Sequence, residues 1–165
     1  MMNIELIIRE NLGPPTNMER IIRAIGVQLD RNASLAECIS GQTENIGDGK
    51  YKISTNKNDH YYRKRFTMAH ELGHFLYHSH LIGDGVDDNR AYRNTQDGQF
   101  YNPLIGRREE TEANKFAASI LMPSELVEEE RAEGGDVAAL AKKFQVSRQA
   151  MEIRLDGLNR PIPAE

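Results

Sequence analysis

The feature that most constrains the fold is a helix predicted from about residue 60 to 82, built around the pentapeptide HELGH at residues 70–74. Apolar residues recur along this segment at helical spacing and no proline interrupts it, which is typical of a buried amphipathic helix. Side chains four positions apart on a helix point the same way, one turn apart. His70 and His74 can therefore hold one Zn²⁺ while Glu71 faces a water on that ion.

Composition places the chain among globular proteins, because 165 residues with 39% hydrophobic and 28% charged side chains suit one compact domain. A net charge of -4 argues against a general nucleic-acid binder, which would normally be basic. Apolar stretches such as residues 4–8 are far too short to span a bilayer, and the N-terminus lacks the pattern of a secretory signal. The single cysteine, Cys38, allows no internal disulfide. We therefore expect a cytoplasmic protein that does not contact membranes.

The remaining patterns predict an α+β fold around the histidine-bearing helix. Thr16 and Glu19 have the spacing of a capping box for a short helix. Extended segments within residues 27–56 predict a small antiparallel sheet beside the histidines. Residues 82–106 are rich in Gly, Asp and Asn, and a loop of that length indicates a mobile lid or a disordered segment. A second long helix is predicted over residues 108–122.

Two histidines do not complete a catalytic zinc site, which usually has three protein ligands and one open position. The helix over residues 108–122 is the expected source of the third ligand, because it is amphipathic and carries several carboxylates. Glu109 and Glu112 lie one turn apart on one face. Either could bind the metal while the other supports a ligand histidine from behind, and spacing alone leaves both open. With Glu71 as general base, these residues suffice for metal-assisted hydrolysis.

Two motifs in this order resemble the ImmA/IrrE family of zinc metallopeptidases. They are AHELGHFLYH at residues 69–78 and E-x-E-A-N-x-F-A-x-x-x-L-M-P at residues 110–123. The resemblance implies a zincin-like metallopeptidase core in which His70, His74 and Glu112 bind the metal and the glutamate of HExxH is the general base. It also implies Zn²⁺ as the cofactor, although Mn²⁺ or Fe²⁺ could occupy the same ligands.

The predicted organisation is a zincin-like metallopeptidase domain over residues 1–123 and a C-terminal helical segment over residues 124–165 packed on it. Residues 136–151 have the form of a helix-turn-helix, and Arg148, Gln149 and Arg154 could contact phosphates or bases of DNA. The segment carries few basic groups, and two helices packed on a core need the same apolar spacing. A structural or partner-docking role is therefore favoured, and direct DNA binding is not expected.

Two further features of a peptidase site are left open by the sequence. An extended substrate could add to the edge of the sheet at the strand predicted over residues 50–56. A donor for the developing oxyanion could come from one of several tyrosines, among which chemistry alone does not choose: Tyr61, Tyr62, Tyr92 and Tyr101. His78, one turn beyond His74, is expected to support the site without binding the ion.

The sequence thus predicts a cytoplasmic, zinc-dependent endopeptidase. The resemblance implies that its substrate is a helix-turn-helix transcriptional repressor, whose cleavage would relieve repression in a mobile element or a stress response. One alternative is a non-proteolytic zincin-like regulator, such as a toxin–antitoxin partner. Another is a DNA-binding regulator with a structural metal. The intact Glu71 favours the enzyme, because a binding module has no need of it.

Overall fold

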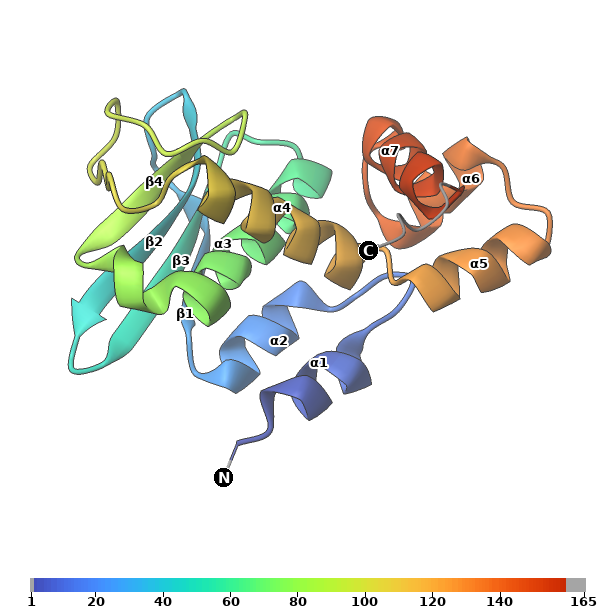
Figure 1. Cartoon of the computed structure of the whole chain (residues 1–165), viewed down its shortest axis with the longest axis horizontal. Helices are drawn as coiled ribbons and strands as arrows, with labels where there is room; N and C mark the ends of the chain where they lie inside the picture. Colours follow the sequence, from blue (N-terminus) through green and yellow to red (C-terminus); the bar gives the residue numbers. More distant parts are fainter. Residues whose placement is uncertain (1, 160–165) are drawn as a thin grey trace, which may run out of the picture.

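The computed structural model describes residues 2–159, which form seven helices and one four-stranded sheet (Figure 1). The helices are α1 (Ile4–Asn11), α2 (Met18–Ile25), α3 (Tyr61–Ile82), α4 (Arg107–Leu121), α5 (Ser124–Ala132), α6 (Val137–Phe144) and α7 (Arg148–Asn159). The strands are β1 (Gln28–Ala33), β2 (Ile39–Gly47), β3 (Lys50–Asn56) and β4 (Gly85–Asn89). The predicted α+β class is confirmed. Across the described residues, no helix combines the length and the apolar character needed to cross a membrane.

The sheet is mixed, whereas the sequence predicted an antiparallel one. Its order is β1-β3-β2-β4, with β2 antiparallel to both of its neighbours and β1 parallel to β3. The strand at residues 50–56 is β3, which is hydrogen-bonded on both sides. The idea that a substrate adds to this strand is therefore wrong, because β3 has no free edge.

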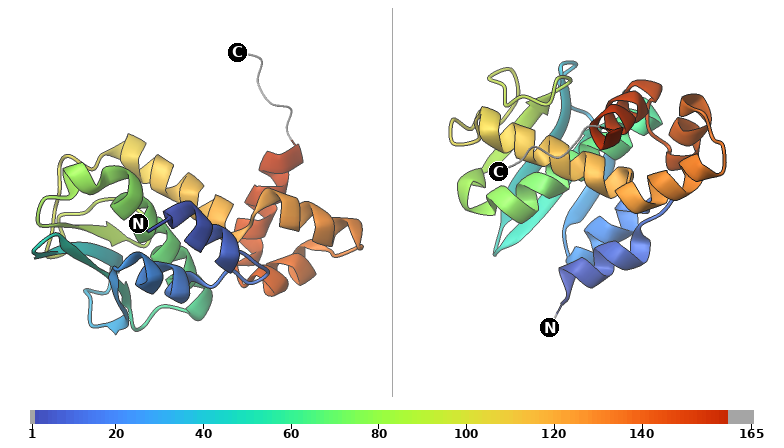
Figure 2. Two further views of the ribbon diagram at one scale, coloured as in Figure 1. Left: turned by 90° about the horizontal axis from the view of Figure 1, so that it is seen from below. Right: turned by 45° about the vertical axis from the view of Figure 1, so that its right-hand side comes forward.

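Helix α3 packs on β2 and β3, and α4 packs along α3, so that the histidine-bearing turn lies between the sheet and α4 (Figures 1 and 2). The ends of α3 agree with the prediction. His60 caps the first turn of this helix by accepting a hydrogen bond from the Tyr62 amide at 3.1 Å. Gly73 permits close approach of α4, because a Cβ there would lie 3.2 Å from the Ala113 Cα. This contact brings the first turn of α4 over the histidines.

The N-terminal helix α2 begins differently from the prediction. Its cap is Asn17, whose side chain accepts a hydrogen bond from the Arg20 amide at 3.1 Å. Thr16 is fully buried, and its hydroxyl donates to the Ile120 carbonyl at 2.7 Å instead. The predicted capping box does not form, because the end of α4 supplies a tertiary partner for Thr16.

The C-terminal helices share a core with the rest of the chain. Val127, Leu140 and Phe144 belong to the same buried cluster as residues of α2 and α3. Arg65, a buried cation on α3, donates to the carbonyls of Thr16 at 2.8 Å, Gln145 at 3.2 Å and Phe144 at 3.4 Å. Packing and hydrogen bonds therefore cross residue 123, the boundary that the sequence suggested.

Residues 82–106, predicted to be irregular throughout, contain β4 and are fastened to the fold. The Asp87 carboxylate accepts a hydrogen bond from the Phe100 amide at 2.7 Å. The buried Asn102 amide donates to the Leu81 carbonyl at 2.8 Å and to the Ile82 carbonyl at 2.9 Å. The segment after β4 is thereby tied to the end of α3.

Replacing Asn102 with alanine is expected to lower the free energy of unfolding by about 1–3 kcal/mol, because the carbonyls of Leu81, Ile82 and Gly85 lose their donor. Chemical denaturation followed by circular dichroism measures this change. Gln96→Ala, at an exposed position in the same segment, is the control and should change the free energy by less than about 0.5 kcal/mol. Equal effects of the two substitutions would mean that Asn102 does not anchor the segment.

Candidate metal centre

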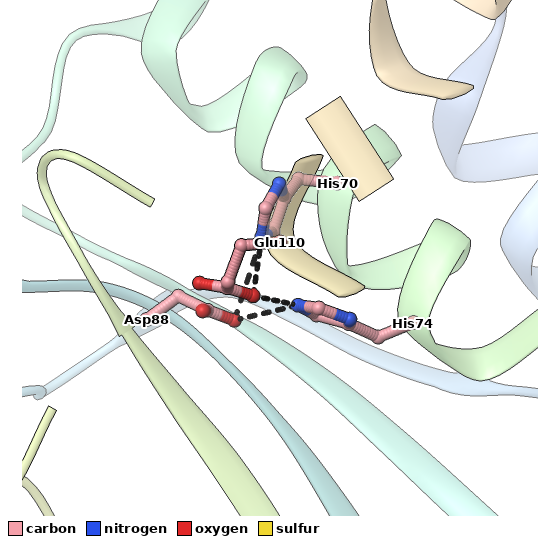
Figure 3. A group of neighbouring side chains, drawn as sticks. All are labelled: His70, His74, Asp88 and Glu110. Atoms are coloured by element: carbon pink, nitrogen blue, oxygen red, sulfur yellow. Dashed lines mark ion pairs between the residues drawn. The ribbon is translucent and has the colours of Figure 1, made fainter. Parts of the chain in front are cut away.

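Four side chains from three elements converge at one point between the sheet and α4 (Figure 3). His70 and His74 come from α3, Asp88 comes from β4, and Glu110 comes from the first turn of α4. One ligand atom from each lies within 4.8 Å of all the others, and all four residues are buried. The fold thus gathers two imidazoles and two carboxylates in a nearly dry environment.

The separations between these atoms suit a small cation. The His70 Nε2 lies 3.6 Å from the Asp88 Oδ2 and 3.5 Å from the Glu110 Oε1. The His74 Nε2 lies 3.4 Å and 2.5 Å from the same two oxygens. Ligands about 2.0–2.1 Å from a tetrahedral zinc ion are separated by about 3.3–3.4 Å. Three of the four separations are close to this value, and the fourth is shorter.

The polar atoms at the centre have no other partners among the described residues. Both Nε2 atoms, both Asp88 oxygens and both Glu110 oxygens are buried, and their only ion pairs within residues 2–159 are with one another. Buried polar groups are nearly always paired, because an unpaired group loses its hydration without compensation. A divalent metal ion would satisfy all four side chains, so the residues present fit such an ion.

The electrostatics of the centre favour positive charge. Burial alone would lower the pKa of His74, but Asp88 and Glu110 outweigh it and raise this pKa to about 9. The pKa of His70 is also raised, against the effect of burial, chiefly by Asp88. Burial would raise the pKa of Asp88, yet the charges of His74 and His70 hold it well below its ordinary value. The carboxylates therefore create a negative potential at the two imidazoles.

Hydrogen bonds behind the histidines orient them. The His70 Nδ1 lies 2.8 Å from the Asn114 Oδ1, which can only accept, so Nδ1 carries the proton and Nε2 keeps its lone pair for a metal. The His74 Nδ1 lies 3.0 Å from the His78 Nδ1, at a point where α3 departs from helical geometry. His78 thus contacts a histidine of the centre from behind, the position expected for it.

Glu112, the third metal ligand suggested by the resemblance, lies outside the centre. Its side chain is 44% exposed, its Oε1 accepts a hydrogen bond from the Arg108 Nε at 3.1 Å, and its Oε2 lies 3.5 Å from the His78 Nε2. Glu109, the other candidate, is also absent from the group. The structure corrects both assignments, because Glu110 is the carboxylate that α4 directs toward the histidines.

The reason for this correction is the rotation of α4 about its axis. The buried face of α4 includes Ala113 and Ala117, and Glu110 precedes these residues by three and seven positions. Such spacing places Glu110 on the same face. Glu112 is adjacent to Ala113 and is therefore turned about 100° away from it. The alanine pattern could have identified Glu110 from the sequence.

Glu71 is placed beside the four donors without being one of them. Its Oε2 accepts a hydrogen bond from the Thr43 hydroxyl of β2 at 2.5 Å, and its Oε1 has no partner among the described residues. Gly41 leaves the space, because a Cβ there would lie 3.1 Å from the Glu71 Oε1 and 2.3 Å from the Thr67 Cγ2. Burial raises the pKa of Glu71 well above its ordinary value, and the Asp88 carboxylate adds to the rise. A carboxyl group in this position is suited to taking up a proton.

Of two other residues near the centre, Asp88 was not singled out by the sequence and Tyr92 was one of four tyrosines among which it did not choose. Asp88 lies in the segment predicted to be irregular, and only its pairing with β2 brings it to the histidines. Of the four candidate tyrosines, Tyr92 lies beside the centre, with its ring centroid 5.0 Å from that of His70. Its hydroxyl lies 3.4 Å from the Arg63 Nη1. Tyr61 and Tyr101 are each half exposed.

Comparison with known families agrees with this arrangement. The model of a peptidase family, Peptidase_M78, described as an IrrE N-terminal-like domain, matches residues 36–156. The matched range contains all four donors of the centre as well as Glu71, and it extends across residue 123. A comparison with curated proteins finds no match.

Proposed function

The chain belongs to the Peptidase_M78 family of IrrE N-terminal-like domains, and we propose that it is a zinc-dependent endopeptidase. The observation that carries the proposal is the convergence of His70, His74 and Glu110 on one buried point, with the Glu71 carboxyl beside it. Two imidazoles and one carboxylate form a ligand set used by catalytic zinc in other hydrolases.

Each residue of the centre has a distinct role in this proposal. His70, His74 and Glu110 would hold the ion, which when bound polarises a scissile carbonyl and increases the acidity of water. Glu71 would accept the proton of the attacking water and deliver it to the leaving amine. The Thr43 hydroxyl fixes one oxygen of Glu71 and leaves the other for this transfer.

The presence of Asp88 favours a second candidate function, a binding protein with a structural metal. Four protein ligands close a zinc site, whereas catalysis requires an open position. Against this candidate stands Glu71, because a buried carboxyl with an unpaired oxygen costs stability and adds nothing to a purely structural site. We therefore favour the enzyme, in which the fourth coordination position of the metal would be taken by substrate or water in place of Asp88.

For the substrate, we propose a helix-turn-helix transcriptional repressor. Support comes from the IrrE-like family assignment and from the ImmA/IrrE motifs in the sequence. Direct DNA binding is not part of the proposal, since the chain has a net charge of -4.

The test combines the purified protein with the purified repressor encoded beside its gene, with added zinc or with a chelator. We expect cleavage at one position with zinc and none with the chelator. An intact repressor in the presence of the zinc-loaded protein would contradict the proposed substrate.

Gel shifts at two salt concentrations test the DNA-binding alternative, which predicts a steep loss of affinity for DNA as the salt concentration rises.

A further inference from the structure

Next to the metal centre lies a groove of about 820 Å³, a size typical of ligand sites. Its walls come from the first half of α3, from Tyr92, from α4 and from α7, which lies near the C-terminal end of α4 (Figures 1 and 2). None of the four metal donors lines it. The groove is therefore a separate surface beside the centre.

Two of the residues that line the groove also contact His70. Asn114 holds the His70 Nδ1 at 2.8 Å, and the ring of Tyr92 lies against the His70 ring. A molecule lying in the groove would thus be separated from a metal donor by a single side chain. This adjacency links the groove to the proposed reaction.

Much of the groove lining is apolar, and its most exposed part is on α7. Ile153, on α7, is 66% exposed, the largest exposed fraction among the large apolar side chains of residues 2–159. The apolar side chains that line the groove are Phe66, Ala118, Met122, Val146, Ala150 and Ile153. Covering such a surface releases water and favours association with another apolar surface.

The charged residues of the groove are all basic, although the chain as a whole is acidic. Arg63, Lys115 and Arg154 line it, and no Asp or Glu of residues 2–159 does. Within the described part of the chain, none of these three cations forms an ion pair with a carboxylate. Arg154 is half-buried, and its Nε donates to the Met122 carbonyl at 3.0 Å. The groove therefore presents positive charge beside an apolar floor.

We propose that this groove docks an acidic, apolar segment of the protein substrate and holds it next to the metal centre. The proposal rests on the proposed peptidase function and adds the chemistry by which the substrate is recognised. Side chains such as Leu or Phe would cover Ile153 and its neighbours, while Asp or Glu would pair with Lys115 and Arg154. A nucleic acid would use the cations but would leave the apolar floor uncovered, so a peptide fits better.

Binding of two synthetic amphipathic peptides to the zinc-loaded Glu71→Gln variant tests this proposal by fluorescence anisotropy. The peptides share their leucine positions, but one carries glutamates where the other carries lysines. We expect the glutamate peptide to bind at least about tenfold more tightly. The double variant Lys115→Glu with Arg154→Glu should reverse the preference. Equal binding of the two peptides, or binding of neither, would overturn the proposal.

A matched control reverses two cations that do not line the groove, Lys142→Glu with Arg148→Glu, and changes the net charge by the same amount. This variant should keep the preference for the glutamate peptide, and an identical loss in both double variants would refute docking in the groove.

Competition with duplex DNA tests whether the groove binds nucleic acid instead. Displacement of the peptide by DNA at physiological salt, dependent on Lys115 and Arg154, would make the groove a nucleic-acid site and overturn the proposal.

The binding assay separates this proposal from the proposed function, because it uses an inactive variant and needs no hydrolysis. If the repressor stays intact but the charge preference is observed, the proposed substrate is wrong and the docking site stands. If the repressor is cut, the groove variant should raise KM without changing kcat, and an unchanged KM would contradict the proposal. Zinc content and circular dichroism show that the variants remain folded.

Discussion

Replacing Glu71 with glutamine is expected to reduce peptide hydrolysis by about 10²–10⁴-fold and to leave metal binding intact. Glutamine has nearly the same shape and its amide oxygen can still accept the hydrogen bond from Thr43, but it cannot take up a proton. Metal should be retained, because Glu71 is not one of the four donors. Cleavage rate and zinc content, measured on the same preparation, check both parts of the prediction.

An exposed glutamate far from the centre provides the control for this variant. Glu128→Gln on α5 removes the same charge and should retain full activity. A Glu71→Gln variant as active as the parent protein would overturn the assigned mechanism. A variant that is inactive because it has lost its zinc would show that Glu71 maintains the centre and would remove the evidence for proton transfer.

The second large effect is expected at the third ligand. Glu110→Gln should weaken zinc binding by more than about 100-fold, whereas Glu112→Gln should weaken it by about tenfold at most. Glu110 is one of the four donors of the centre. Glu112 is not, and it can affect the centre only indirectly, because its Oε2 lies 3.5 Å from the Nε2 of His78. Competition with a fluorescent chelator measures both affinities.

The two substitutions are matched, because they make the same chemical change two residues apart on one helix. Any difference between them therefore reports position alone. A greater loss of affinity in Glu112→Gln than in Glu110→Gln would return the ligand role to Glu112. Similar small losses in both would mean that Asp88 and the histidines suffice to hold the ion.

Local patterns predicted the elements that depend on nearby residues. The ends of α3 followed from helical spacing and the lack of proline, and the pairing of His70 with His74 followed from the period of the helix. The choice of the third ligand failed, because it depends on which face of α4 is buried. The spacing of Glu110 from Ala113 and Ala117 indicates that Glu110 lies on the buried face, whereas the resemblance to the family motif favoured Glu112.

The remaining features depend on contacts between distant segments. Asp88 lies in a run of polar residues with no strand-like alternation, and β4 forms because β2 offers it a free edge. The parallel pairing of β1 with β3 has no local signature either, so the sequence suggested an antiparallel sheet. Likewise, Thr16 does not cap α2, because its hydroxyl donates a hydrogen bond to the Ile120 carbonyl. This partner lies 104 positions further along the chain, so no local pattern could predict it.

The anchoring of Arg65 has a consequence for how this chain can change over evolutionary time. Its guanidinium donates to the main-chain carbonyls of Thr16, Phe144 and Gln145, so the side chain of Gln145 can change without breaking these bonds, whereas that of Phe144 is also held by the core. The path of the backbone cannot diverge in the same way, and Gln145 has a positive φ of 56° that glycine or asparagine adopts readily. We therefore expect relatives to keep this turn, with an apolar residue in place of Phe144 and a residue that accepts a positive φ in place of Gln145, and recombination that exchanges the last three helices to succeed only when it preserves that turn.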